Sequence, residues 1–504
     1  MPPASERFSW MLGLAGLFTL VLAAKLILIA HFGQPVPFWD QWDAEAYRLY
    51  KPYLEGTLQP QAFIEPHNEH RILLTRLLGI VELEAAGQWD AQLQMVVNAA
   101  LHAGFVAALA GYLGACLTPI RRLALTLFTA AVFAFPIGWE NTLQAIQSSF
   151  YFALLFSTIA LICLITARPL SARWMLGLAC AVAAFFSQSG GALVLPAAIA
   201  VITLQILLRV RAVTRHEVLA LTLMLVLGAA LLMGVVTIPA HEPLKAHSLW
   251  QFLRALLAVA TAPFPFDRKF FYLPIGLLLH IPTGVMAWRM LRKPTAATAR
   301  EWAVLAIVAW VGLQMMAMAY GRASVATSSR YQDLFMILLP IDLAALCCLA
   351  QGKAIAAKTQ AAWVALFAIG AVNLAFYTWP SVVARGKEAA AQMANTAAYL
   401  RTGDKAVLEG KALLDLPYYS VEPFAGFLTD PTIRLLLPSS LRPADAPLGD
   451  LHRQLFLKGA LAPVVLGLKD ALLIGAPWMV LLGIALFGFA AVKVRAGAHP
   501  SALP

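Results

Sequence analysis

Two aspartates stand three residues apart in an aromatic segment near the start of the chain, Phe38-Trp39-Asp40-Gln41-Trp42-Asp43-Ala44-Glu45-Ala46-Tyr47. In a helix this spacing places Asp40 and Asp43 on one face. Interleaved tryptophan and tyrosine rings are typical of a helix that lies in the headgroup layer of a membrane. A carboxylate at that level can act as a general base on a polar substrate. An amphipathic elbow whose acidic side chains are only solvated would show the same pattern.

A second polar cluster follows at Glu65-Pro66-His67-Asn68-Glu69-His70-Arg71. The proline suits the first turn of a helix, which would place His67 and His70 on one face with Glu69 and Arg71 beside them. Hydrogen bonding to a sugar or a phosphate is the first interpretation of this cluster. A purely structural helix start is the alternative.

The same histidines also permit a metal site. His67 and His70, together with Asp40 or Asp43, would supply nitrogen and oxygen ligands for a divalent ion such as Mg²⁺ or Mn²⁺. The spacing differs from that of the zinc proteases, which place two histidines four residues apart with a glutamate after the first. A metal therefore stays a secondary interpretation.

Two further clusters adjoin apolar runs. The segment Trp139-Glu140-Asn141-Thr142-Leu143-Gln144 offers a carboxylate and amides for sugar hydroxyls, and its tryptophan offers a stacking face. The other cluster contains Arg322 and Ser329-Arg330-Tyr331, and the forked guanidinium group matches phosphate oxygens. Arginines that only reach the lipid headgroups are the alternative. Weaker candidates that we expect on the same outer face are His241, Glu242, His247, Asp267, Arg268 and Lys269.

The composition places these clusters in a membrane protein. Of the 504 residues, 61% are hydrophobic and 12% are charged, against about 25% charged residues in a soluble domain. The mean hydropathy is +0.74, and the apolar residues form runs of about 20, the length that crosses a bilayer. A soluble enzyme and a nucleic-acid-binding protein are excluded, although the net charge is +11.

Hydropathy predicts an all-α bundle of about 12 transmembrane helices. The predicted spans are 9–30, 92–116, 123–138, 148–167, 174–188, 190–208, 218–238, 271–291, 302–320, 334–350, 361–379 and 471–492. Lysine and arginine concentrate in alternate loops, which the positive-inside rule places in the cytoplasm with both termini. The apolar stretch 249–265 suits an interfacial or a re-entrant helix.

This topology places two long stretches on the outer face. We expect a membrane module at 1–380 whose outer loop, 31–91, carries interfacial helices and the active site. A small outer domain at 381–470 and a last span with its tail at 471–504 follow. Nine of the 26 acidic residues of the chain lie between 31 and 91, so the chemistry concentrates in the first outer loop.

The layout resembles the GT-C class of membrane glycosyltransferases, and in particular a group of bacterial membrane proteins within it. The resemblance covers most of the chain, but its motifs are short. The stretches that carry it are Asp40-Gln41-Trp42-Asp43, His67-Asn68-Glu69-His70-Arg71, Trp139-Glu140-Asn141-Thr142, Ser329-Arg330-Tyr331 and the neighbourhood of Leu436-Leu437-Pro438.

The resemblance implies an inverting transferase that takes a sugar from a polyprenyl-phosphate donor and passes it to an acceptor glycan or lipid. It implies a site on the periplasmic face of the bacterial inner membrane, among membrane lipids. Asp40 or Asp43 would be the base, Asp40 being nearer the end of the first span. The donor phosphate would bind Arg330, with Arg322 and Tyr331. The substrate-binding residues would be His67, Glu69, His70, Arg71, Trp139, Glu140, Asn141 and Gln144. Some members of the class require a metal.

Two other functions remain open. A transporter or flippase of a lipid-linked saccharide would have as many spans, but it should carry polar residues at the bilayer midplane. The predicted spans are nearly free of charge, which favours an enzyme at the interface. An O-antigen polymerase or ligase would use outer-loop arginine and histidine, and Arg330 and His67 keep that alternative open.

Overall fold

The computed structural model describes residues 4–264, 272–350 and 356–498. Helices are the regular structure of these residues, and one isolated antiparallel bridge joins His67 to His70. The bundle consists of α1 (Ala4–Phe32), α4 (Ala91–Gly114), α5 (Pro119–Ala134), α7 (Ser148–Thr166), α8 (Ala172–Phe185), α9 (Val194–Leu207), α10 (Arg215–Met233), α14 (Arg300–Gly321), α16 (Leu338–Leu349), α17 (Ala356–Thr402) and α21 (Ala462–Ala498).

Shorter elements connect or extend these helices. Within the bundle they are η3 (Pro136–Gly138), α6 (Trp139–Leu143), η4 (Ala145–Gln147), η5 (Ser189–Leu193), α11 (Leu249–Ala260), α12 (Tyr272–Leu278), α13 (Ile281–Arg292) and α15 (Ser329–Met336). At one end of it they are the π-helix η1 (Trp42–Tyr50), α2 (Lys51–Leu54), η2 (Pro60–Phe63), α3 (Leu73–Ala86), η6 (Pro239–Leu244), η7 (Lys405–Val407), η8 (Leu413–Asp415), α18 (Val421–Thr429), α19 (Pro431–Leu436) and α20 (Leu448–Gln454).

Ten helical stretches in the described residues are long and apolar enough to cross a membrane. They are α1, α4, α5 with α6, η4 with α7, η5 with α9, α10, α14, α15 with α16, α17 and α21. The protein is therefore an α-helical, multi-pass membrane protein, with ten such stretches in the described part of the chain rather than twelve.

Two predicted spans are too short or broken. The span predicted at 174–188 is the 14-residue helix α8, about 21 Å long at 1.5 Å per residue, against the roughly 30 Å of a hydrocarbon core. The span predicted at 271–291 is divided between α12 and α13, with a turn at Leu279 and His280. Hydropathy detects an apolar run of span length, but it does not detect where the helix inside that run is interrupted.

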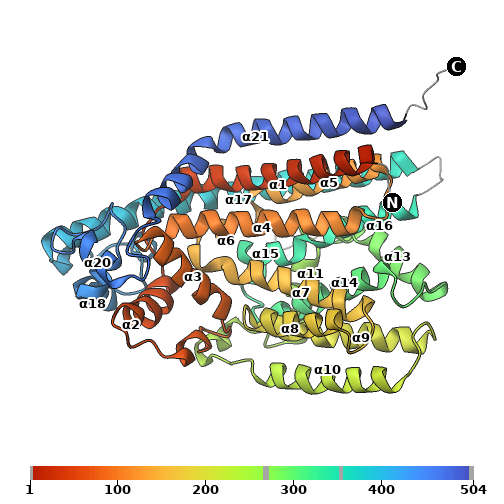
Figure 1. Cartoon of the computed structure of the whole chain (residues 1–504), viewed down its shortest axis with the longest axis horizontal. Helices are drawn as coiled ribbons and strands as arrows, with labels where there is room; N and C mark the ends of the chain where they lie inside the picture. The colour runs from red at the N-terminus through yellow and green to blue at the C-terminus, as the bar shows by residue number, and fades with distance from the viewer. Residues whose placement is uncertain (1–3, 265–271, 351–355, 499–504) are drawn as a thin grey trace.

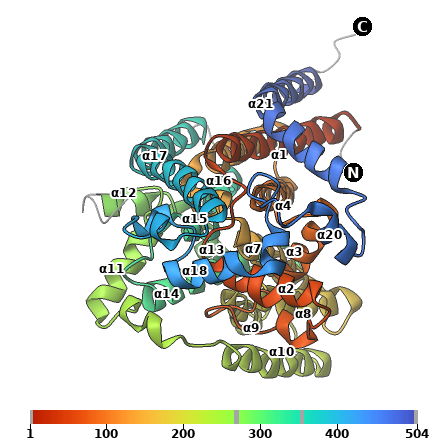
Figure 2. The same cartoon turned by 90° about the vertical axis from the view of Figure 1, so that its left-hand side faces the viewer.

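The bundle helices run along the long axis of the molecule, and both termini lie at the same end (Figure 1). We call the opposite end, which carries α2, α3, α18 and α20, the loop end; the sequence predicts that it faces outward. Figure 2 looks onto the loop end, with α2 and α18 in front of the bundle.

The two long stretches outside the bundle share one hydrophobic core. Trp42 of η1 is fully buried between Trp89 (ring centroids 5.3 Å apart) and Phe424 of α18 (5.2 Å). The core also includes Leu83 and two residues of α19, Ile433 and Leu436. The first loop and the C-terminal segment thus fold together, since neither buries these apolar surfaces alone.

Polar contacts connect the same two segments. The Glu84 carboxylate accepts hydrogen bonds from the backbone N–H groups of Phe456 (3.0 Å) and Leu457 (2.7 Å). Lys469 donates to Asp90 at 2.7 Å. Helices α17 and α21 extend across the predicted boundaries at 380 and 471, so the membrane helices continue directly into the loop end.

Candidate functional site

A cavity of about 670 Å³ opens at the loop end, and we call it the polar cavity. Its walls come from six separate parts of the chain, including the first loop, η6, the segment that follows α14, and the C-terminal segment. The charged and histidine side chains that line it are Asp40, Asp43, Arg48, His67, Glu69, His70, His241, Arg322 and Arg330. Eight predicted site residues line this cavity: Asp40, Asp43, His67, Glu69, His70, Arg322, Arg330 and Tyr331.

The acidic side of the polar cavity is held by two tyrosines of the C-terminal segment. Tyr419 donates its hydroxyl hydrogen to Asp40, and Tyr418 donates to Asp43 at 2.6 Å. His67 Nε2 lies 3.3 Å from Asp40 Oδ2. Burial alone would raise the pKa of Asp40, but the hydrogen bond and charge of His67, with Tyr419 and Arg330, lower that pKa below its ordinary value. Asp40 is therefore ionised at neutral pH.

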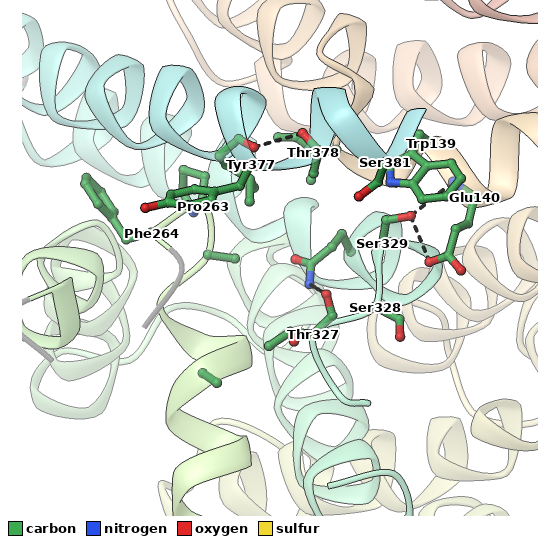
Figure 3. A pocket seen from close by; sticks show the side chains of 15 residues that line it. Trp139, Glu140, Pro263, Phe264, Thr327, Ser328, Ser329, Tyr377, Thr378 and Ser381 are labelled. Atoms are coloured by element: carbon green, nitrogen blue, oxygen red, sulfur yellow. Dashed lines mark hydrogen bonds between the residues drawn. The ribbon is translucent and has the colours of Figure 1, made fainter. Parts of the chain in front are cut away.

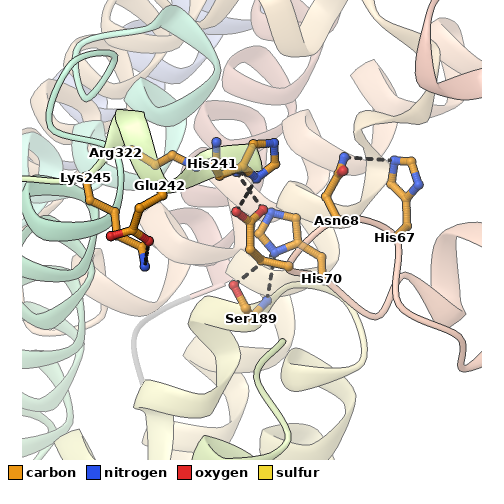
Figure 4. A network of polar contacts seen from close by, with 9 residues as sticks. His67, Asn68, His70, Ser189, His241, Glu242, Lys245 and Arg322 are labelled. Carbon is orange, nitrogen blue, oxygen red and sulfur yellow. Dashed lines mark hydrogen bonds and ion pairs between the residues drawn. The ribbon is translucent and has the colours of Figure 1, made fainter. Parts of the chain in front are cut away.

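The basic side of the polar cavity carries a half-buried ion-pair network. Arg322 donates to Glu69 Oε2 at 2.6 Å, and His241 Nδ1 lies 2.5 Å from Glu69 Oε1. Figure 4 shows Arg322 and His241 meeting above His70. Burial raises the pKa of Glu69, but the His241 hydrogen bond and the Arg322 charge outweigh it, so the pKa of Glu69 is lowered. Glu69 neutralises part of the positive charge of the polar cavity, which Arg48 and Arg330 also line.

The segment with the two histidines is a turn and not a helix. His67 and His70 exchange backbone hydrogen bonds of 2.7 and 3.0 Å, and the next helix, α3, begins only at Leu73. The predicted helix at Pro66 is wrong because Asn68 takes a left-handed conformation (φ +50°), which closes the turn. Both histidines still reach the polar cavity.

His70 is held neutral at the base of this turn. Its Nδ1 accepts from the Ser189 backbone N–H at 3.3 Å and lies 2.9 Å from Ser189 Oγ (Figure 4). Burial lowers the pKa of His70 to about 4, although the Glu69 charge opposes this. An uncharged imidazole positions neighbours and hydrogen-bonds to a ligand, but it supplies no positive charge to a phosphate.

A second cavity of about 290 Å³ lies on the other side of the Arg330 segment, and we call it the groove. Trp139 and Glu140 line the groove with Ser329, facing Tyr377 and Thr378 of α17 (Figure 3). The Glu140 carboxylate accepts from Ser329 Oγ (2.9 Å) and the Arg330 backbone N–H (3.0 Å). Glu140 Oε1 also lies 3.6 Å from the Arg330 guanidinium group, so Glu140 connects the groove to the polar cavity.

Three predicted substrate-binding residues line neither cavity. Asn141 is fully buried and donates to the Arg330 carbonyl (2.7 Å) and to Asp333 (3.0 Å), so it supports the arginine instead of a ligand. Gln144 accepts from Gln147 at 2.8 Å. Arg71 donates to the Ile64 carbonyl at 2.8 Å, which braces the turn.

The sequence interpretation missed Tyr419 and Arg48 as lining residues, and it ranked His241 among the weaker candidates. Tyr419 is 379 residues from Asp40 along the chain, and its motif, Leu416-Pro417-Tyr418-Tyr419, carries no signal beyond that of a turn. The sequence predicts His241 on the same face as the other candidates, but no spacing in the sequence indicates that it contacts Glu69. The weaker candidates Asp267, Arg268 and Lys269 lie outside the described residues.

The four possible metal ligands do not assemble into a site. Within 4–264, 272–350 and 356–498, no group of three or more histidine, cysteine, aspartate or glutamate side chains is placed to hold a metal ion. Asp40 and Asp43 are hydrogen-bonded to different tyrosines, and His70 is turned toward Ser189. The donor set therefore does not fit Mg²⁺ or Mn²⁺ in this arrangement.

Glu45 anchors the helix that carries the aspartates. Its buried carboxylate accepts from Gln41 (2.8 Å), Trp89 (3.0 Å) and Gln94 (3.0 Å), three neutral donors from three elements. Burial raises the pKa of Glu45 to about 7, although these hydrogen bonds act in the opposite direction. The π-helix η1 is thus fixed to α4 directly behind Asp43.

Charged groups also lie inside the bundle, contrary to the expectation that the spans are nearly free of them. Lys25 of α1, His102 of α4 and Asp333 of α15 are 5%, 0% and 4% exposed. Lys25 donates to Thr142 at 3.0 Å, and Tyr151 donates to Asp333 at 3.4 Å. Asp333 of this buried group accepts a hydrogen bond from Asn141, and Asn141 also donates to the Arg330 carbonyl.

In comparisons with known proteins, no family model, no curated protein and no solved structure matched this chain. The function must therefore be inferred from the geometry of the site.

Proposed function

We propose that the protein is an inverting membrane glycosyltransferase of the GT-C type. It moves a sugar from a polyprenyl-phosphate donor to an acceptor glycan or lipid. The reaction takes place in the polar cavity, at the outer face of a bacterial inner membrane.

One observation carries this proposal: an ionised carboxylate and two arginines, from distant parts of the chain, line the same cavity. Asp40 lies between α1 and η1, whereas Arg322 follows α14 and Arg330 lies in α15. The cavity volume of about 670 Å³ lies within the roughly 300–1,000 Å³ of small-molecule sites. A base and a phosphate-binding group that face one space are what glycosyl transfer from a lipid phosphate requires.

The proposed reaction is a direct displacement. Asp40 takes the proton of an acceptor hydroxyl, and the oxygen attacks the anomeric carbon from the face opposite the phosphate. The bond between that carbon and the phosphate oxygen breaks, and the configuration inverts. Arg330, with Arg322, binds the lipid phosphate as its negative charge increases. The proton on Asp40 then passes to water.

The groove provides the place for the donor lipid. It adjoins the polar cavity through the pair Glu140–Arg330, and its apolar wall includes Phe264, Leu374 and Tyr377 near the predicted outer end of α17. A phosphate at Arg330 would thus have sugar on one side and an isoprenoid chain on the other. Glu140 holds Arg330 in this position through its backbone N–H (3.0 Å) and an ion pair of 3.6 Å with its guanidinium group.

The proposal is tested by a transfer assay with the purified full-length protein in nanodiscs, with radiolabelled polyprenyl-phosphate sugars and a membrane extract as acceptor. Asp40→Asn is expected to lower the rate by about 10²- to 10⁴-fold, the contribution of a general base. Arg330→Ala should lower it through a loss of phosphate stabilisation.

Matched controls are Glu422→Gln and Arg453→Gln, whose side chains are 74% and 76% exposed outside both cavities. These variants should keep full activity. If Asp40→Asn and Asp43→Asn both transferred sugar at the wild-type rate, the carboxylate mechanism would be wrong. A lane with chelator tests for a metal.

Transport of a lipid-linked saccharide is the second candidate, and the buried group of Lys25, His102 and Asp333 is the observation that favours it. Ionisable residues inside a membrane often mark a transport path. All three side chains are closed off from solvent, however, while the polar cavity is open at the loop end. Movement of labelled lipid across a sealed vesicle without formation of a new glycoside would replace the transferase by a transporter.

A further inference from the structure

Trp39 holds a backbone conformation that bulky residues rarely adopt. Its φ is +48°, in the left-handed region. The Trp39 backbone N–H donates to the Pro417 carbonyl at 2.7 Å, so the C-terminal segment holds the residue in place. Its indole N–H is enclosed and makes no hydrogen bond within the described structure. Both features cost stability, and such costs are retained where a side chain serves a ligand.

The ring of Trp39 forms an aromatic wall with Tyr419 beside the proposed base. The two ring centroids are 4.8 Å apart, and Phe38 stacks on Trp39 at 4.9 Å. The Tyr419 hydroxyl donates to Asp40, which fixes the orientation of that ring. Both Trp39 and Tyr419 line the polar cavity.

This wall is not an ordinary packing contact. Tyr419 is 43% exposed, whereas its neighbour Tyr418 is 9% exposed and belongs to the hydrophobic core of the loop end. The left-handed residue Asn68 lines the same cavity near His67. The cavity therefore presents aromatic carbon at one side of Asp40 and hydrogen-bonding groups at the other.

A sugar ring matches this combination. One face of a pyranose carries C–H groups with a slight positive charge, which an aromatic face attracts through its negative quadrupole. Its hydroxyls bind carboxylates and imidazoles at the ring edge. A bare lipid headgroup or an unglycosylated serine side chain has no flat face of this kind.

We propose that Trp39 and Tyr419 bind a saccharide ring of the acceptor, so the acceptor is a molecule that already carries sugar. This inference rests on the proposed function and narrows it, because it excludes an unglycosylated lipid or protein as acceptor. The hydroxyl that Asp40 activates belongs to the stacked ring or to its neighbour.

The first test measures binding without transfer. Saturation-transfer NMR of the full-length protein in nanodiscs, with a panel of neutral methyl glycosides and disaccharides, should detect binding to the wild type. Tyr419→Leu removes the ring and should weaken binding about tenfold, the upper range for an aromatic contact. Tyr419→Phe keeps the ring but loses its hydrogen bond to Asp40, and it should weaken binding less than Tyr419→Leu does. Tyr320→Leu, at a 57% exposed tyrosine outside the cavity, is the control.

A second variant guards against misfolding. Trp39→Gly removes the indole but suits φ +48°, since glycine adopts that conformation without strain. It should lose saccharide binding while the protein stays folded and monodisperse. Where transfer is measurable, both Trp39→Gly and Tyr419→Leu should raise the acceptor KM with the donor KM unchanged.

The outcomes separate this inference from the proposed function. Transfer to an unglycosylated acceptor alone, or an unchanged acceptor KM in Tyr419→Leu, would overturn the saccharide site and leave the transferase standing. A wild type that binds no saccharide would overturn it as well. Saccharide binding that is lost in Tyr419→Leu, in a protein that transfers nothing, would support the site and refute the transferase.

Discussion

The buried charges behind Arg330 yield a prediction that needs no substrate. Lys25 and Asp333 are 5% and 4% exposed, and they interact electrostatically inside the bundle. We consider three variants: Lys25→Met, Asp333→Asn, and the two combined. Each single change leaves one charge buried without its counter-charge, whereas the double change leaves none.

The expected magnitudes follow from this burial. Removal of one partner of a buried pair costs about 3–5 kcal/mol of unfolding free energy, because the remaining charge stays in a low-dielectric site. Replacement of both by neutral groups of similar volume is often close to neutral. The double variant should thus be more stable than either single variant. The coupling energy between the two positions should be about 1–3 kcal/mol.

The assay is equilibrium unfolding of the purified protein in mixed micelles, followed by the loss of helical circular dichroism. The matched surface pair is Lys405 and Glu422, whose nitrogen and oxygen lie 2.6 Å apart with side chains 47% and 74% exposed. The same cycle on that pair, Lys405→Met with Glu422→Gln, should show no measurable coupling. A coupling at Lys25 and Asp333 no larger than that of the surface pair would refute the reasoning.

Three other predictions concern single side chains. Burial raises the pKa of Glu45 from 4.5 to about 7. Between these pH values the folded protein therefore binds one proton that the unfolded chain has lost. The free energy of unfolding should fall by up to about 3 kcal/mol as the pH rises from about 5 to 8. Glu45→Gln should remove that slope in unfolding titrations, and an unchanged slope would contradict the assignment. In Gly138→Ala, the added carbon would lie 2.3 Å from Asp333 Oδ1; the variant should lower the thermal midpoint, and a wild-type midpoint would show that the carboxylate moves freely. Glu84→Ala leaves two backbone donors without their acceptor and should speed tryptic cleavage after the exposed Lys458, a change that circular dichroism of the intact bundle should not show.

Hydropathy predicted the membrane bundle well and its interruptions poorly. The segments around Lys25 and His102 read as uniform apolar spans, and both form continuous helices, α1 and α4. The short helix α8 and the division of 271–291 were not predicted. The break between 174–188 and 190–208 was predicted, whereas the turn at Leu279 and His280 was not.

The candidate site was predictable where polar side chains stand out against an apolar chain. Asp40, His67 and Arg330 were chosen on that ground, and the structure brings them to one cavity. Asn141 was chosen on the same ground, yet it is buried and bound to Asp333. Residue type alone does not distinguish a ligand-binding amide from one that satisfies a buried carboxylate.

The missing part of the site comes from contacts between distant segments. Tyr419 binds Asp40 only because the first loop and the C-terminal segment bury one core around Trp42. No local sequence pattern in either segment indicates that the two segments pack together. The shared core was likewise not predicted, since the two stretches were assigned to separate domains.

That partnership also sets the order in which the protein becomes complete during its synthesis. Asp40 and Tyr419 are separated by 379 residues, so at about 5–20 residues per second, roughly 20 to 75 s pass between their emergence from the ribosome. Throughout that time the first loop lacks the core residues that the C-terminal segment supplies. Helices α4 to α17 enter the membrane before the C-terminal residues that contact Trp42, Asp40 and Asp43 have been synthesised. Maturation of the polar cavity is thus one of the last events in the biogenesis of the chain, and a ribosome that stops before Tyr419 leaves a bundle in the membrane without a finished site.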